Sequence, residues 1–147
     1  MPTFYQQGGS YDPAKPLKHQ NEILGTSSIK SSGTTGIGYA TGAGGSVTQI
    51  TSKATGVTIH KLCGTITTHA ASLTNAVEVG FTVTNSLVAA TDVPVVAIKS
   101  GATADSYQVT VDAVAAGSFR ISISNCSGGA LAEALVLNFI VIKGVAS

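Results

Sequence analysis

The chain has 147 residues, enough for one domain with a hydrophobic core and a tail. Charged residues make up 10% of it, against about 25% in ordinary soluble domains, and hydroxyl groups replace them, with 18 Thr and 16 Ser. The net charge is +1 with a single Arg, which argues against the basic face of a nucleic-acid-binding protein. The chain has no run of about 18 apolar residues, the length needed to span a membrane, and its first residues lack the pattern of a secretion signal. We therefore expect neither nucleic acid nor a membrane as a partner.

Residues 1–43 differ in character from the rest of the chain. They hold three of the four prolines and a Ser/Gly/Thr-rich stretch that resembles a flexible linker, and no helical or strand periodicity persists. A disordered tail is one interpretation, but such tails are poor in aromatic residues. This segment carries six large apolar side chains, Phe4, Tyr5, Tyr11, Leu17, Ile23 and Leu24. We predict an extended N-terminal arm that binds a partner through these six side chains, followed by a domain over residues 44–147.

From Val47 onward, apolar and polar residues alternate with a period of two, which is typical of half-buried strands. The pattern is clearest over residues 77–84, 107–112 and 118–124, and further strand-like runs cover residues 47–51, 57–68 and 93–99. Turn signals rich in Gly, Asn and Ser separate the runs. Residues 70–76 and 129–134 read either as short helical turns or as loops. The sequence predicts an all-β fold, an antiparallel, jelly-roll-like β-sandwich, with a barrel as the alternative.

The last strand-like run, residues 133–143, is apolar on both sides. One side carries Leu135, Leu137, Phe139 and Val141, and the other carries Val136, Ile140 and Ile142. A strand that is apolar on both sides is normally covered on both sides. We expect the first side to pack into the core. We expect Val136, Ile140 and Ile142 to form an oligomer interface, or else to be covered by the arm.

His60, Cys63 and His69 are the residues with the chemistry of metal ligands. A tetrahedral zinc site needs four such ligands, or three plus water, and no Cys-x-x-Cys pair completes the set. His60 and Cys63 also have opposite parity along a strand, so their side chains point to opposite faces. No Gly-x-Ser-x-Gly elbow is present, and the acidic residues are scattered without a carboxylate pair. We predict no metal, no cofactor and no catalytic residue, and we expect Cys63 and Cys126 to be free thiols in a reducing compartment.

Five segments have sequences that are more specific than the alternation of a strand. They are Gly44–Thr58, Phe81–Ser86, Ala90–Val93, Val114–Ile121 and Leu131–Phe139. Together, over residues 43–143, they resemble a β-module of virion proteins from tailed bacteriophages. The module is similar to capsid decoration (cement) proteins of the jelly-roll type, and similar modules occur on phage tail fibres.

A short chain with no fibrous shaft, together with the aromatic and proline-bearing arm, favours the capsid decoration protein. The resemblance implies a non-enzymatic structural protein on the outer surface of the virion capsid, assembled in the host cytoplasm. Its partners would be the major capsid protein and itself, as a homodimer or homotrimer. Two alternatives belong to other classes: a receptor- or glycan-binding module of a phage tail fibre or spike, and a hydrolase of host surface polymers, which would need a carboxylate pair.

Overall fold

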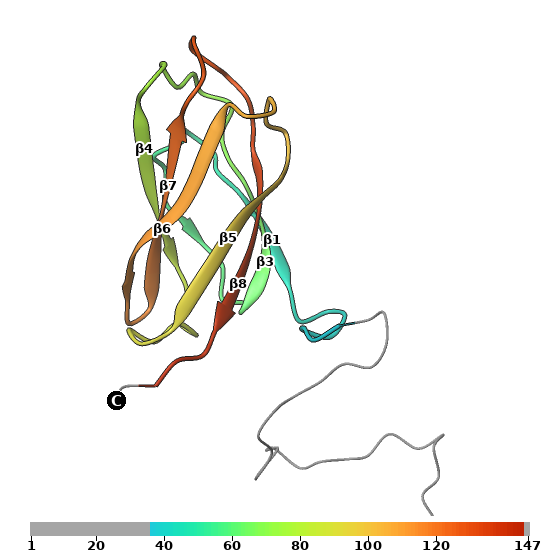
Figure 1. The fold of residues 1–147 in the computed structure, drawn as a ribbon. Helices are drawn as coiled ribbons and strands as arrows, with labels where there is room; N and C mark the ends of the chain where they lie inside the picture. The colour runs from blue at the N-terminus through green and yellow to red at the C-terminus, as the bar shows by residue number, and fades with distance from the viewer. Residues whose placement is uncertain (1–35, 146–147) are drawn as a thin grey trace, which may run out of the picture. The chain divides into compact units, whose positions relative to one another are not determined.

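The computed structural model describes residues 36–145, and the chain contains a compact unit that covers Gly38–Ser147 (Figure 1). All regular secondary structure in the described residues is β-strand, which confirms the predicted all-β class. The two segments with alternative interpretations, residues 70–76 and 129–134, form loops and turns, and one β-bridge between Leu73 and Leu131 joins them.

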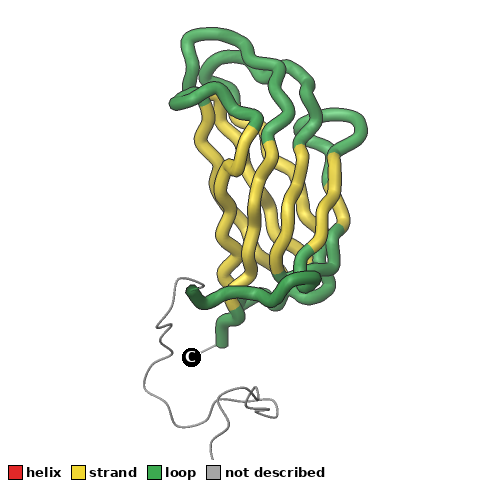
Figure 2. The backbone as a smooth tube through the Cα atoms, turned by 90° about the vertical axis from the view of Figure 1, so that its right-hand side faces the viewer, coloured by secondary structure: helices red, strands yellow, loops and turns green. Residues whose placement is uncertain are grey.

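Eight strands lie in the described part of the chain: β1 (Gly45–Thr48), β2 (Val57–Thr58), β3 (Cys63–Thr67), β4 (Glu78–Thr84), β5 (Val93–Ser100), β6 (Tyr107–Ala115), β7 (Ser118–Asn125) and β8 (Val136–Ile142). They form two four-stranded sheets. The first sheet has the order β1-β3-β8-β5 and the second has the order β2-β4-β7-β6. Figures 1 and 2 show the two sheets as layers joined by loops at both ends.

The sheets are mixed, so the prediction of purely antiparallel pairing is wrong for two strand pairs. β1 pairs with β3 in parallel, and β2 pairs with β4 in parallel. The cause is the path of the chain, which alternates between the sheets from β1 to β6 and reverses direction each time. The predicted single strand over residues 57–68 is two strands, because residues 59–62 carry the chain from the second sheet to the first.

The core lies between the sheets and is built from the inward side chains of both. In β4, Phe81 and Val83 are buried while Thr82 and Thr84 are exposed, so the predicted alternation is confirmed. The buried hydrophobic residues are Val57, Ile59, Ile66, Leu73, Phe81, Val83, Val88, Phe119, Ile121, Ile123, Leu135, Leu137, Phe139 and Val141. The predicted core side of the last strand is therefore buried as expected.

Irregularities occur in the edge strands β5 and β6, which contact each other where the two sheets meet. Each shows a shift of register, between Ile98 and Ser100 in β5 and between Val111 and Ala113 in β6. Pro94 also removes one backbone donor from β5. Bulges and prolines discourage a further strand from pairing at an edge, so the flat faces of the sheets remain the larger surfaces for contact with other proteins.

Candidate interaction surface

The register of the first sheet gathers the outward side chains of its strands into one apolar surface. Val93 lies opposite Ile142, and Val95 lies opposite Ile140. Cys63 of β3 lies on the other side of Ile140. We define the apolar face by the outward apolar side chains of these strands: Cys63, Val93, Val95, Ala97, Val136, Ile140 and Ile142.

The apolar face is partly open to solvent. Val93 and Ile142 are each 55% exposed, and Val95 is 45% exposed. Val136 and Ile140 are half-buried by their neighbours in the sheet. A cluster of this kind, formed by side chains from adjacent strands, is the type of surface that marks a protein–protein contact.

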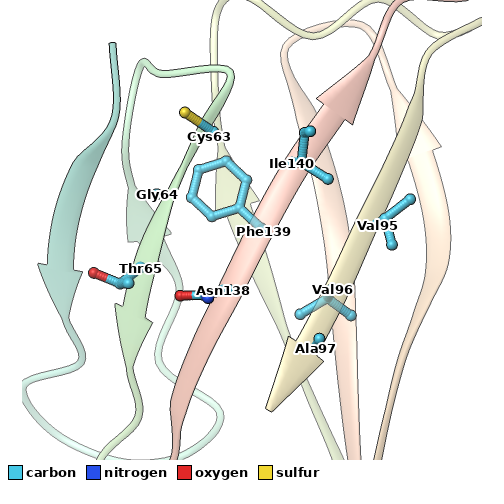
Figure 3. A pocket seen from close by; sticks show the side chains of 9 residues that line it. All are labelled: Cys63, Gly64, Thr65, Val95, Val96, Ala97, Asn138, Phe139 and Ile140. Carbon is cyan, nitrogen blue, oxygen red and sulfur yellow. The ribbon is translucent and has the colours of Figure 1, made fainter. Parts of the chain in front are cut away.

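A groove of about 410 Å³ runs across this face (Figure 3). Residues of β3, β5 and β8 line it, and no residue of the second sheet does. Its outward side chains are those of Cys63, Thr65, Val95, Ala97, Asn138 and Ile140. The groove is therefore uncharged and mainly apolar, with the exposed amide of Asn138 near its middle.

The outer face of the second sheet has a different chemistry. It carries the outward Ser and Thr side chains of β4 and β7, and an ion pair joins Arg120 to Asp112. The hydroxyl of Ser122 donates to Asp112 at 2.6 Å and accepts from Arg120 at 2.7 Å. The guanidinium of Arg120 lies over Gly80, where a Cβ atom would overlap with it. This face is thus polar, and its charged side chains Arg120 and Asp112 are paired with each other.

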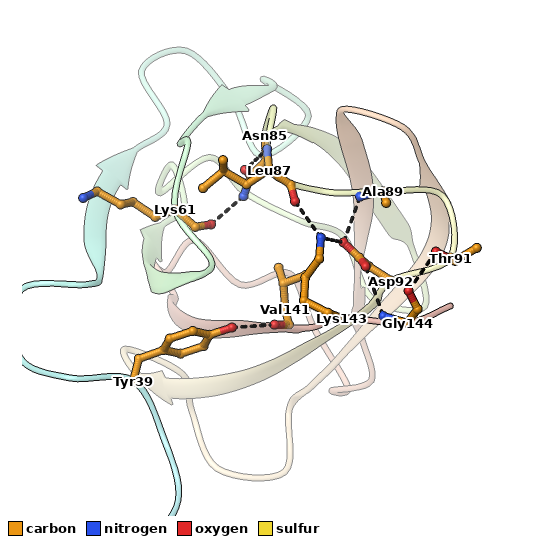
Figure 4. Close-up of polar contacts among 10 residues, drawn as sticks. All are labelled: Tyr39, Lys61, Asn85, Leu87, Ala89, Thr91, Asp92, Val141, Lys143 and Gly144. Carbon is orange, nitrogen blue, oxygen red and sulfur yellow. Dashed lines mark hydrogen bonds and ion pairs between the residues drawn. The ribbon is translucent and has the colours of Figure 1, made fainter. Parts of the chain in front are cut away.

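A polar cluster holds the end of β8 against the loop that precedes β5 (Figure 4). The side chain of Asp92 has no solvent exposure, and its carboxylate accepts hydrogen bonds from the ammonium of Lys143 and from the backbone N–H of Ala89 and Gly144. The hydrogen bond from Lys143, followed by that from Ala89, holds the pKa of Asp92 below its ordinary value. Lys143 also donates to the carbonyl of Leu87 at 2.9 Å.

The chain enters the sheet beside the same strand. The hydroxyl of Tyr39 donates to the carbonyl of Val141 at 2.8 Å. The backbone N–H of Val141 donates to the carbonyl of Leu62 just before β3 begins, so Tyr39 extends the hydrogen bonding of β8 beyond the end of β3. Figure 4 shows this contact close to the cluster around Asp92.

A second polar cluster ties together the loops at the other end of the sheets. Lys53 is only 3% exposed, and its ammonium donates to the carbonyls of His69 and Glu133. Burial lowers the pKa of Lys53. The side chain of Gln49 joins the same loops, since it donates to the carbonyl of Thr55 at 2.7 Å and accepts from the N–H of His69 at 3.0 Å. These groups serve as structural ties between loops.

The acidic side chain of this cluster is also hydrogen-bonded. The carboxylate of Glu133 accepts hydrogen bonds from the hydroxyl and the backbone N–H of Thr103, which hold its pKa below the ordinary value. Burial raises the pKa of Tyr107 to about 12. The groove lies elsewhere, on the sheet face, so these titratable side chains do not line it.

The residues with metal-ligand chemistry do not converge. His60 lies before β3 and His69 lies after it, at opposite ends of the strand. The Nδ1 atom of His60 accepts from the N–H of Ser86, and the Nδ1 atom of His69 accepts from the N–H of Ala71. Cys63 and Cys126 are free. No group of three His, Cys, Asp or Glu side chains in residues 36–145 is arranged to hold a metal ion.

Of the predicted interface residues, Val136, Ile140 and Ile142 do point outward from β8. The arm residues Phe4, Tyr5, Tyr11, Leu17, Ile23 and Leu24 lie outside the described residues. Sequence reasoning missed the contribution of β5, whose Val93, Val95 and Ala97 complete the apolar face. The signal was present, because residues 93–98 are apolar at both parities, as β8 is. Asn138 is visible in the sequence as the residue that interrupts the apolar pattern of β8, but the pattern gave it no role.

None of the described residues forms a helix long and apolar enough to cross a membrane. No protein family, curated protein or solved structure was found to match this chain. The surface of the domain is therefore the main guide to its function.

Proposed function

We propose that this chain is a non-enzymatic structural protein that binds other protein chains, in the role of a decoration (cement) protein on the capsid of a tailed bacteriophage. One observation carries the proposal. The two outer faces of the sandwich differ, because the first sheet presents the apolar face and the second presents polar side chains with the ion pair of Arg120 and Asp112. A domain that acts alone in water has no need of such an asymmetry.

The free energy gained by covering the apolar face favours binding to another protein. Full burial of a Val or Ile side chain from water contributes roughly 1.5–3 kcal/mol, so a half-exposed side chain gains about half of that when a partner covers it. Val93, Val95 and Ile142 all stand to gain in this way. The gain per contact is modest, and a cement protein acts through many copies whose joint attachment makes each later contact intramolecular.

The assignment to jelly-roll proteins belongs to the same proposal. The antiparallel pairs β3–β8 and β4–β7 lie in different sheets, as in a two-stranded ribbon folded over on itself. β5 and β6 then pair with the other sides of β8 and β7. This winding supports a shortened jelly roll to which β1 and β2 add parallel edge strands.

Within this proposal the partners are the major capsid protein and further copies of the chain, and the location is the outer surface of the virion capsid. The arm residues Phe4, Tyr5, Tyr11, Leu17, Ile23 and Leu24 would lie across a neighbouring subunit. An extended segment covers much surface per residue, which suits a clasp between subunits.

The test is reconstitution. Purified chain is mixed with capsids assembled without it, and binding is measured by co-sedimentation, followed by the temperature at which the capsids open. We expect saturable binding and a higher opening temperature. Failure to bind, or binding to isolated tails instead, would favour a receptor- or glycan-binding module of a tail fibre or spike.

A further inference from the structure

We infer that the apolar face packs against the same face of a second copy of this chain, with Asn138 at the two-fold axis. This inference rests on the proposed function only in treating the apolar face as a surface that binds protein. It names the occupant of that surface and the residue that fixes its register.

The charge on the face favours a second copy. Among the outward strand residues of the first sheet, Lys99 at the end of β5 is the one charged side chain, and the groove residues are all neutral. In a two-fold interface the same patch meets itself, so like charges near the axis would repel. An uncharged centre avoids that repulsion. The second sheet, with Glu78, Asp112 and Arg120 on its strands, offers no such neutral centre.

Asn138 gives the face a means of pairing with itself. Its register partners are Thr65 on β3 and Ala97 on β5, so its side chain lies midway across the groove and is exposed. A primary amide carries both donors and an acceptor. Two Asn138 side chains related by a two-fold axis can therefore exchange a pair of N–H to O hydrogen bonds. A single polar residue buried in an apolar interface is known to fix the register of the two partners in this way.

The size of the face predicts how tight the dimer is. The three strands of the apolar face, about 4.8 Å apart and seven residues long at about 3.3 Å per residue, cover roughly 330 Å². A stable interface buries about 800 Å² on each partner. The face supplies less than half of that, so we expect a reversible dimer that forms as concentration rises and is completed where many copies are held side by side.

Sedimentation velocity of the full chain tests the inference, from about 10 to about 500 μM, a range that brackets weak association. We expect the mass of the wild type to rise toward that of a dimer. Asn138→Asp places two carboxylates at the axis and should raise the dissociation constant at least about tenfold, since like charges in an interface are strongly unfavourable. Gln108→Glu is the matched control: it also turns an exposed strand amide into a carboxylate, but on the second sheet, and should associate like the wild type.

Val95→Glu is a second variant that does not depend on Asn138, and circular dichroism checks that each variant is folded. A wild type that stays monomeric throughout, or Asn138→Asp and Val95→Glu proteins that dimerise like the wild type, would overturn the inference. So would an equal loss in Gln108→Glu. Binding to capsids is measured separately. A monomeric chain that binds capsids would refute this dimer and leave the proposed function intact. A chain that dimerises but does not bind capsids would support this dimer and refute the proposed function.

Discussion

Phe119 and Phe139 pack against each other across the sandwich, with ring centroids 5.8 Å apart and planes tilted by 46°. The first belongs to β7 and the second to β8, so this contact joins a central strand of each sheet. Tilted ring pairs add stabilisation beyond the area they bury. The position of the apolar face depends on this contact, because β8 carries the core on one side and the face on the other.

We predict that Phe139→Ala lowers the free energy of unfolding by about 3–5 kcal/mol, the usual cost of removing a buried aromatic ring. Urea denaturation measures this loss. Val77→Ala is the control, since Val77 is 43% exposed, and should change stability by less than about 1 kcal/mol. Equal losses in the two variants would show that the ring contact does not lie at the centre of the core.

The cluster around Asp92 predicts a loss of stability in acid. The pKa of Asp92 is lower in the folded chain than its ordinary value, so its contribution to stability is present above that ordinary value and is lost as pH falls through the folded pKa. We expect Asp92→Asn to melt at a lower temperature than the wild type at pH 7. The difference should shrink as the pH is lowered below the folded pKa.

Thermal denaturation followed across this pH range gives the measurement. Asp105→Asn changes an exposed carboxylate and should leave the dependence on pH close to that of the wild type. A constant difference between Asp92→Asn and the wild type at every pH would mean that ionised Asp92 does not stabilise the fold.

Removing the buried ammonium of Lys53 should lower the stability of the fold. Lys53→Met should leave the carbonyls of His69 and Glu133 without their donor, at about 1–3 kcal/mol for each buried group that stays unpaired. Chemical denaturation measures the loss, and hydrogen exchange of residues 49–56 shows whether that loop opens first. Lys61→Met, at an exposed position, should be nearly neutral. A stable Lys53→Met protein with a protected loop would contradict the role assigned to the ammonium.

The arm gives a prediction that concerns attachment alone. Deleting residues 2–30 removes Phe4, Tyr5, Tyr11, Leu17, Ile23 and Leu24 but leaves all the strands described above. We expect the truncated chain to keep its β-sheet circular dichroism and cooperative unfolding while its affinity for capsids falls sharply. Undiminished affinity would make the arm a passive tail.

Sequence reasoning succeeded where one strand has one buried side. In β4 the alternation of Phe81 and Val83 with Thr82 and Thr84 predicts the buried face directly, because the side-chain period of a strand is two. The two sides of β8 could be separated for the same reason. The pairing of strands could not be predicted, because the neighbours of β8 lie about 40 to 75 residues away along the chain and pattern alone carries no such information.

Other features depended on tertiary contacts. Lys53 lies in a loop with Thr51, Ser52 and Thr55 and reads as a surface residue, yet two distant carbonyls hold it inside. The run 57–68 reads as one strand, since Ile59 and Leu62 keep it apolar through the crossing between sheets. The apolar face is the clearest case. Its β8 half follows from the sequence, but its β5 half becomes part of the same surface only through the register of Val93 with Ile142.

We propose that this chain is a structural protein of the capsid surface, and its place in the particle is the most direct test. Phage particles that carry the chain are labelled with an antibody against residues 44–147 and imaged by electron microscopy. We expect label over the head, in a regular arrangement with many copies per particle. Label confined to the tail or its fibres, with none on the head, would contradict it.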